Sequence, residues 1–74
     1  MKMNIMQRAA QDDYHAQLIA QGMEYAGADV FSVTNDSKGN ILVYCKHREE
    51  INGEWIDQKI HEAVTSKAEH YAAA

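Results

Sequence analysis

The chain has no proline, one cysteine and only isolated glycines among its 74 residues, and each scarcity excludes a class of small protein. A single cysteine, Cys45, cannot close an internal disulfide. Isolated glycines exclude the glycine-rich loop that cradles phosphate groups. No apolar run approaches the ~20 residues needed to cross a bilayer, so we expect no membrane span. With no proline, no repeat and no linker-like stretch, residues 1–74 are expected to form a single compact domain.

Basic residues are also scarce, at seven against eleven acidic residues, which gives a formal charge of −4. This balance argues against a general affinity for nucleic acid or for an anionic membrane. The opening residues become polar too soon for a signal peptide. We therefore expect a cytoplasmic protein with Cys45 reduced.

A chain of this length buries only about 60% of the surface that its unfolded form exposes. Cores this small commonly depend on a disulfide, a metal ion or a partner subunit. One cysteine among four histidines is a poor start on a zinc site, so no metal or other cofactor is expected. Self-association into a homodimer is the predicted support.

Residues 4–26 are rich in Ala, Gln, Met and Leu, which predicts a helix that ends at Gly27. Placing side chains about 100° apart around this helix gathers an Ala-rich stripe on one face. Alanine side chains are small, so this stripe can pack closely against a sheet. A second stripe needs another cover, either the C-terminal helix or a second copy of the chain. We assign it to the dimer interface; it consists of Tyr14, Leu18 and Tyr25.

Two strands are predicted at residues 29–34 and 41–48, joined by the turn residues 35–40. A three-residue loop with Gly39 in the left-handed conformation makes Asp36 face Asn40. The same register opposes Val33 to Val43 and Phe31 to Cys45, and it directs Ile41, Val43, Cys45 and His47 toward the core.

The sequence after the second strand allows two interpretations. Asn52-Gly53 is typical of a two-residue hairpin, which predicts a third strand at 54–58 and a helix at 60–73. In the other interpretation Asp57 is the N-cap of the last helix and only two strands form. The predicted fold is α+β, in the order αβββα or αββα.

No segment carries a complete catalytic set. Cys45 and His47 lie two apart on a strand, too far apart for a dependable hydrogen bond, and burial beside Phe31 is expected for the thiol. His61-Glu62 lacks a second histidine at position 65, which is Thr. We expect no enzyme, and His70 is interpreted as a surface residue.

The outer side of the predicted sheet carries aromatic and basic side chains together, and we take them as the partner-binding site. They are Tyr44, Lys46, Arg48, Trp55 and Lys59. Such a set suits a protein interface, and alternatively it suits single-stranded nucleic acid. In the simplest structural interpretation the C-terminal helix covers Trp55 and Tyr44.

The order helix, three strands, helix resembles the double-stranded-RNA-binding domain, and residues 65–74 are loosely similar to that family's last helix. The lysine cluster of that helix is represented by Lys67 alone, so the resemblance implies a fold and no activity. The leading hypothesis is a small non-enzymatic inhibitor or adaptor that binds another protein, of a type usual in phages and mobile elements.

Overall fold

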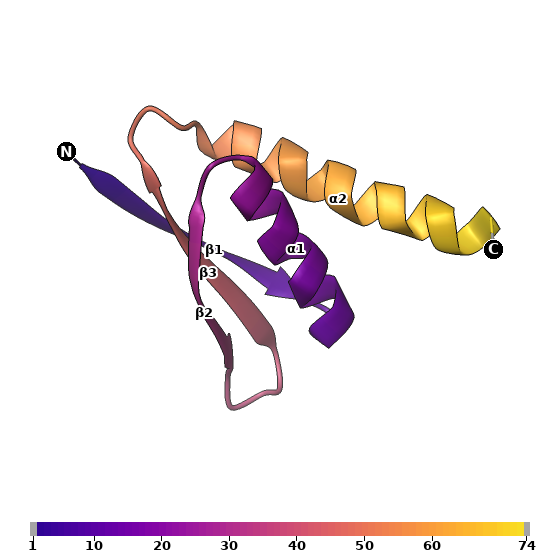
Figure 1. Cartoon of the computed structure of the whole chain (residues 1–74). Helices are drawn as coiled ribbons and strands as arrows, with labels where there is room; N and C mark the ends of the chain where they lie inside the picture. Colours follow the sequence, from indigo (N-terminus) through magenta and orange to yellow (C-terminus); the bar gives the residue numbers. More distant parts are fainter. Residues whose placement is uncertain (1, 74) are drawn as a thin grey trace.

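The computed structural model describes residues 2–73 of the chain and the side chains of residues 2–66. It contains β1 (Met3–Ala10), α1 (Asp13–Tyr25), β2 (Asp29–Asn35), β3 (Ile41–Arg48) and α2 (Gly53–Ala73). The strands form one antiparallel sheet in the order β1-β3-β2, and both helices lie on the same side of it (Figure 1). The α+β class is confirmed, with three strands and two helices, but the chain begins with a strand.

The predicted helix at residues 4–26 is wrong in its first part, because residues 3–10 pair with β3 as a strand. Helix α1 begins only after Asp12, whose extended backbone and side chain cap it. The Asp12 carboxylate accepts a hydrogen bond of 2.7 Å from the His15 N–H, as an N-cap does. Helix propensity alone did not reveal this start, because Met, Gln and Ala are favourable on either side of it.

The predicted hairpin turn at Asn52-Gly53 is also wrong. The Asn52 side-chain oxygen accepts from the Glu54 N–H at 2.8 Å, and its carbonyl accepts from the Trp55 N–H at 3.1 Å. Asn52 is therefore an N-cap, and the expected strand at 54–58 is the start of α2. The alternative start at Asp57 is wrong as well, since Asp57 lies one turn inside the helix. The third strand comes instead from residues 3–10.

The predicted β2–β3 hairpin is confirmed. Gly39 has φ 84°, and the Asp36 N–H donates to the Asn40 carbonyl at 3.0 Å. The Asp36 carboxylate accepts from the backbone N–H groups of Lys38 at 2.8 Å and Asn40 at 2.9 Å. A hydrogen bond from the Asn40 side chain is the main reason that the pKa of Asp36 is lowered. The loop is thus held by one aspartate and one left-handed glycine.

One pairing in that hairpin is wrong. Val33 faces Val43 as predicted, but Val30 rather than Phe31 faces Cys45. Phe31 is the extra residue of a β-bulge between Val30 and Ser32, and a bulge turns side chains out of strict alternation. Phe31 therefore leaves the core and is 51% exposed.

The core lies where α1, β3 and α2 meet. Its four largest fully buried side chains are Met23, Val43, Cys45 and Ile56. The inward orientation predicted for Val43, Cys45 and His47 is confirmed, and Ile56 of α2 is buried with them. Val33 is largely exposed, because it borders a shallow groove beside α1 rather than lying beneath the helix.

Helices α1 and α2 touch through their backbones at Gly22. A Cβ atom placed on Gly22 would lie 2.4 Å from Ile60 Cα and 2.7 Å from Ile60 N. Real side chains do not approach backbone atoms so closely, so only glycine permits this crossing. Gly22 therefore sets how close α2 lies to α1.

The first strand is tied to the last helix by a bidentate ion pair. Arg8 Nε lies 2.7 Å from Asp57 Oδ1, and Arg8 Nη2 lies 2.8 Å from Asp57 Oδ2. Hydrogen bonding from Arg8 lowers the pKa of Asp57, and the same contact raises the pKa of Arg8. The pair joins β1 to α2 across the helix-facing side of the sheet.

Gly22→Ala is expected to destabilise the protein by about 1–3 kcal/mol, because the added methyl group forces two backbones apart. The helix propensity of alanine, better by about 1 kcal/mol, offsets only part of this cost. Gly53→Ala is the matched control, since nothing lies within 4 Å of a Cβ at that position. Urea unfolding of both variants tests the crossing, and equal stability of the two would contradict it.

Asp57→Asn is expected to lower stability at neutral pH by less than about 1 kcal/mol, since both partners are about half exposed. The folded-state pKa of Asp57 is depressed, so its contribution is present above the unfolded pKa and is lost as pH falls through the folded value. The difference between wild type and variant should therefore begin to shrink as pH falls to the ordinary pKa of 3.8, and it should vanish only below the lower folded-state pKa. Thermal unfolding across pH 2–7 measures it; a difference that persists at the lowest pH contradicts this account.

Candidate functional site

The side of the sheet opposite the helices is not covered by any described element (Figure 1). We call it the open sheet face. Strand alternation and the pairing register place on it Met3, Ile5, Gln7 and Ala9 from β1, Leu42, Tyr44, Lys46 and Arg48 from β3, and Asp29, Phe31, Ser32 and Thr34 from β2.

An aromatic pair lies near the middle of the open sheet face. The ring centroids of Phe31 and Tyr44 are 6.1 Å apart with planes inclined at 46°, a favourable tilted arrangement. The bulge in β2 creates this pair by bringing Phe31 to the face of Tyr44. Across β3, Ile5 is 68% exposed. The face thus presents aromatic and aliphatic groups to solvent, a composition typical of binding surfaces.

Two cations lie beside the aromatic pair. Lys46 is flanked in the register by Ile5 and Asp29, and Arg48 faces Met3. Among residues 2–66, no carboxylate lies within ion-pair distance of Lys46 or Arg48. Most acidic residues lie instead in the helical layer or its caps; they are Asp12, Asp13, Glu24, Glu54, Asp57 and Glu62. The open sheet face therefore carries two cations against one carboxylate, Asp29, although the chain as a whole is acidic.

Two of the five predicted binding residues are not on this face. Trp55 and Lys59 lie on α2, because residues 53–58 are helical. Lys59 Nζ is 4.4 Å from the centroid of the Trp55 ring and 3.1 Å from Glu62 Oε2. Placement of Tyr44, Lys46 and Arg48 on one outer face agrees with the sequence, and their role in binding stays a prediction. Sequence reasoning missed Phe31 and Ile5. Placing Phe31 on this face required the bulge in β2, and placing Ile5 in a strand required recognising Asp12 as the start of α1.

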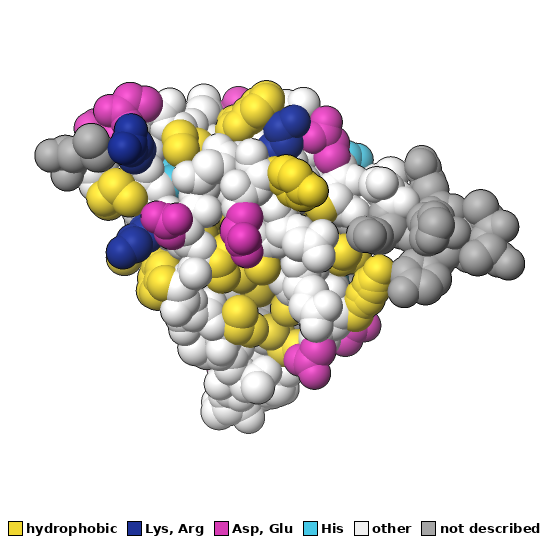
Figure 2. Space-filling model, in the orientation of Figure 1, with side chains coloured by type: hydrophobic (Ala, Val, Ile, Leu, Met, Phe, Trp, Pro, Cys, Tyr) yellow, Lys and Arg dark blue, Asp and Glu magenta, His cyan; other side chains and the backbone are white. Residues whose placement is uncertain are grey.

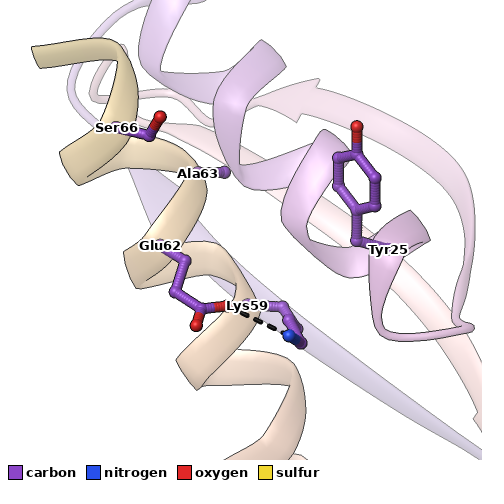
Figure 3. A pocket seen from close by; sticks show the side chains of 5 residues that line it. All are labelled: Tyr25, Lys59, Glu62, Ala63 and Ser66. Atoms are coloured by element: carbon purple, nitrogen blue, oxygen red, sulfur yellow. Dashed lines mark ion pairs between the residues drawn. The ribbon is translucent and has the colours of Figure 1, made fainter.

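A shallow hollow between the helices is the second candidate. It is lined by Tyr25, the last residue of α1, and by Lys59, Glu62, Ala63 and Ser66 of α2 (Figure 3). Its charged groups, Lys59 and Glu62, neutralise each other. Figure 2 shows the same side of the molecule, where hydrophobic patches are separated by acidic side chains. The hollow therefore offers no concentrated charge and no continuous apolar floor.

The three residues predicted to form a dimer interface differ in how far they are exposed to solvent. Leu18 is buried within the chain at 8% exposure, whereas Tyr25 is 80% exposed and Tyr14 is partly exposed. The C-terminal helix lies against α1, as one of the two predicted covers requires. A dimer contact through Tyr14 and Tyr25 stays a prediction.

Cys45 and His47 are both buried on the helix-facing side of β3. Burial raises the pKa of the Cys45 thiol, so it is protonated at neutral pH. The Nδ1–H of His47 donates to the Arg48 carbonyl at 2.9 Å, because a carbonyl can only accept. Within the described residues, no three His, Cys, Asp or Glu side chains are grouped to hold a metal ion. His61 lies 3.5 Å from Thr65 on α2, while His70 lies outside the described side chains.

Comparisons with known proteins give no indication of function, so the functional argument depends on the fold and the open sheet face. No family model, curated protein or solved structure matches the chain. The observed order β-α-β-β-α differs from the order that suggested the double-stranded-RNA-binding domain, and that analogy is wrong. The side chain of Lys67 lies outside those described. Over the described residues, neither helix is long and apolar enough to cross a bilayer.

Cys45 is expected to react slowly with a thiol reagent such as Ellman's reagent, because attack needs an accessible thiolate. Reaction should become fast in urea. The control is Thr34→Cys in a Cys45→Ser background, since Thr34 is exposed on the open sheet face. Rapid reaction of native Cys45, at the rate of the Thr34→Cys thiol, would show that the core does not close over β3.

Proposed function

We propose that this chain is a non-enzymatic binding protein that docks on a partner protein through the open sheet face, as an inhibitor or an adaptor. The observation that carries the proposal is the Phe31–Tyr44 pair, exposed at Phe31 and half-buried at Tyr44, beside two cations without ion-pair partners on an uncovered sheet. Aromatic residues and arginine are the side chains that most often dominate protein interfaces. We place this activity in the cytoplasm, where a free thiol such as Cys45 stays reduced.

The charge distribution of the chain favours an acidic partner surface. Lys46 and Arg48 have no carboxylate partner among the described residues, and the acidic helical layer lies on the far side of the sheet. An acidic partner with an apolar centre would be attracted to the open sheet face and repelled by the opposite side. Such a charge distribution favours one docking orientation and speeds association.

The apolar side chains favour a protein over a nucleic acid. Ile5 and Met3 are exposed aliphatic groups flanking Lys46 and Arg48, and they offer neither a ring for stacking nor a charge for phosphate. The chain also carries a charge of −4, which opposes a polyanion at long range.

One observation favours a second candidate function, binding of single-stranded nucleic acid. Phe31 and Tyr44 are two exposed or half-exposed rings on an antiparallel sheet, with Lys46 next along the strand. Bases stack on such rings and phosphates pair with such cations. Under this alternative, affinity falls steeply with added salt because phosphate contacts release counterions.

The test is capture of a host protein by immobilised wild type and by Phe31→Ala and Arg48→Ala. Each change should weaken the captured complex by about 30-fold or more, as loss of an interface anchor does. Trp55→Ala is the matched control, because Trp55 is 45% exposed but lies on α2. Circular dichroism confirms that each variant is folded.

Three results separate the possibilities. Loss of capture with Phe31→Ala and Arg48→Ala but not with Trp55→Ala supports the open sheet face. Loss with Trp55→Ala alone rejects it in favour of α2. Binding of short RNA or DNA that weakens steeply between low and physiological salt, with no captured protein, supports the second candidate.

A further inference from the structure

The two edges of the sheet are built differently. Edge strand β2 carries the bulge at Phe31 and the charged Asp29, both of which discourage a further strand from pairing. Edge strand β1 pairs with β3 over eight consecutive residues in one unbroken register and contains no bulge. In the described chain no strand pairs with its outer side. The outward Gln7 carbonyl accepts a hydrogen bond of 2.7 Å from Arg8 Nη1 of the same chain, and its second lone pair stays open to a partner. Only the β1 edge is thus regular enough to accept another strand.

The backbone groups that point outward from β1 can be identified. The Glu49 N–H donates to the Lys2 carbonyl at 3.2 Å, so the backbone groups of Lys2 point toward β3. In an antiparallel pair these directions alternate along the strand. The outward N–H and C=O groups therefore belong to Met3, Ile5, Gln7 and Ala9. Their side chains all lie on the open sheet face.

The side chains of β1 suit pairing with an identical strand. Arg8 is the sole charged residue of Met3–Ala10, and Asp57 of the same chain neutralises it through two hydrogen bonds. Two copies of β1 can therefore approach without net repulsion between the strands. One exposed aliphatic side chain of β1 would gain an apolar neighbour across the new pair. Ala9 of the second copy lies opposite Met3 if the pairing is centred at Met6, and opposite Ile5 if it is centred at Gln7.

From these features we propose that β1 pairs antiparallel with β1 of a second copy of this chain, about a twofold axis. The result is a continuous six-stranded sheet in the order β2-β3-β1-β1-β3-β2. A closed twofold pairing satisfies the edge of each chain and leaves no β1 edge open for a third copy. The pairing is centred near Met6 or Gln7, so that the two Arg8 side chains are not directly opposite.

The pairing goes beyond the proposed function and does not rest on it. It joins the two open sheet faces side by side, so that one dimer presents two Phe31–Tyr44 pairs on a single surface. Partner capture depends on Phe31 and Arg48, whereas dimer formation depends on the backbone of β1. Failure of either can therefore be recognised without the other.

Gln7→Pro tests the pairing. Proline removes the N–H that points to the open edge and leaves the bonds to β3 in place, which edge strands tolerate. Gln7→Ala is the matched control, because it removes the same side chain but keeps the N–H. In sedimentation, wild type and Gln7→Ala should be dimers, and Gln7→Pro should dissociate with a dimer constant weaker by about tenfold or more.

Two further variants keep the test decisive if Gln7→Pro fails to fold. Ile5→Lys alters a side chain that is 68% exposed, so the fold should survive while like charges near the axis weaken the dimer. Tyr25→Ser should leave the dimer intact, whereas its loss would locate the interface on α1. The proposal is overturned if wild type is monomeric at every concentration, or if folded Ile5→Lys and Gln7→Pro dimerise like wild type. Amide exchange that is slowed at Ile5, Gln7 and Ala9 only by a captured partner also overturns it, in favour of a strand from that partner.

Discussion

The close crossing of the two helices at Gly22 is the constraint on which the rest of the structure depends. Because no side chain separates the backbones there, α2 can lie against α1 and still insert Ile56 beside Met23 and Val43 in the core. Both helices consequently occupy one side of the sheet. The opposite side receives no cover from the described chain, so Phe31 and Ile5 remain at the surface.

The parts of the fold that could be predicted are those set by local signals. Asp36 and Gly39 define the hairpin loop through hydrogen bonds and backbone conformation within five residues. Once that loop is set, the alternation along β3 places Val43 and Cys45 inside and Tyr44, Lys46 and Arg48 outside. This is why Lys46 and Arg48 were correctly placed on the outer face from the sequence, whereas the apolar Phe31 and Ile5 were not.

The errors arose where a distant contact or a cap overrides composition. Residues 3–10 have helix-favouring side chains, yet they form a strand because β3 lies beside them. Asp12 and Asn52 are N-caps whose side chains accept backbone hydrogen bonds, and the same residue types are also typical of turns. The bulge that exposes Phe31 leaves no distinct pattern in the sequence, since Val30, Phe31 and Ser32 all suit a regular strand. Trp55 was misplaced for the same reason as Asn52.

The position of β1 beside β3 has a consequence for how the chain folds as it is made. Residues 3–10 are synthesised before the strand with which they pair, which spans residues 41–48. Until the ribosome has delivered that strand, the N-terminal segment has only its own helical preference to follow. The β2–β3 hairpin is closed by a short loop, so the entropic cost of bringing its two strands together is much lower. We therefore expect docking of residues 3–10 on β3 to be a late, non-local step of folding.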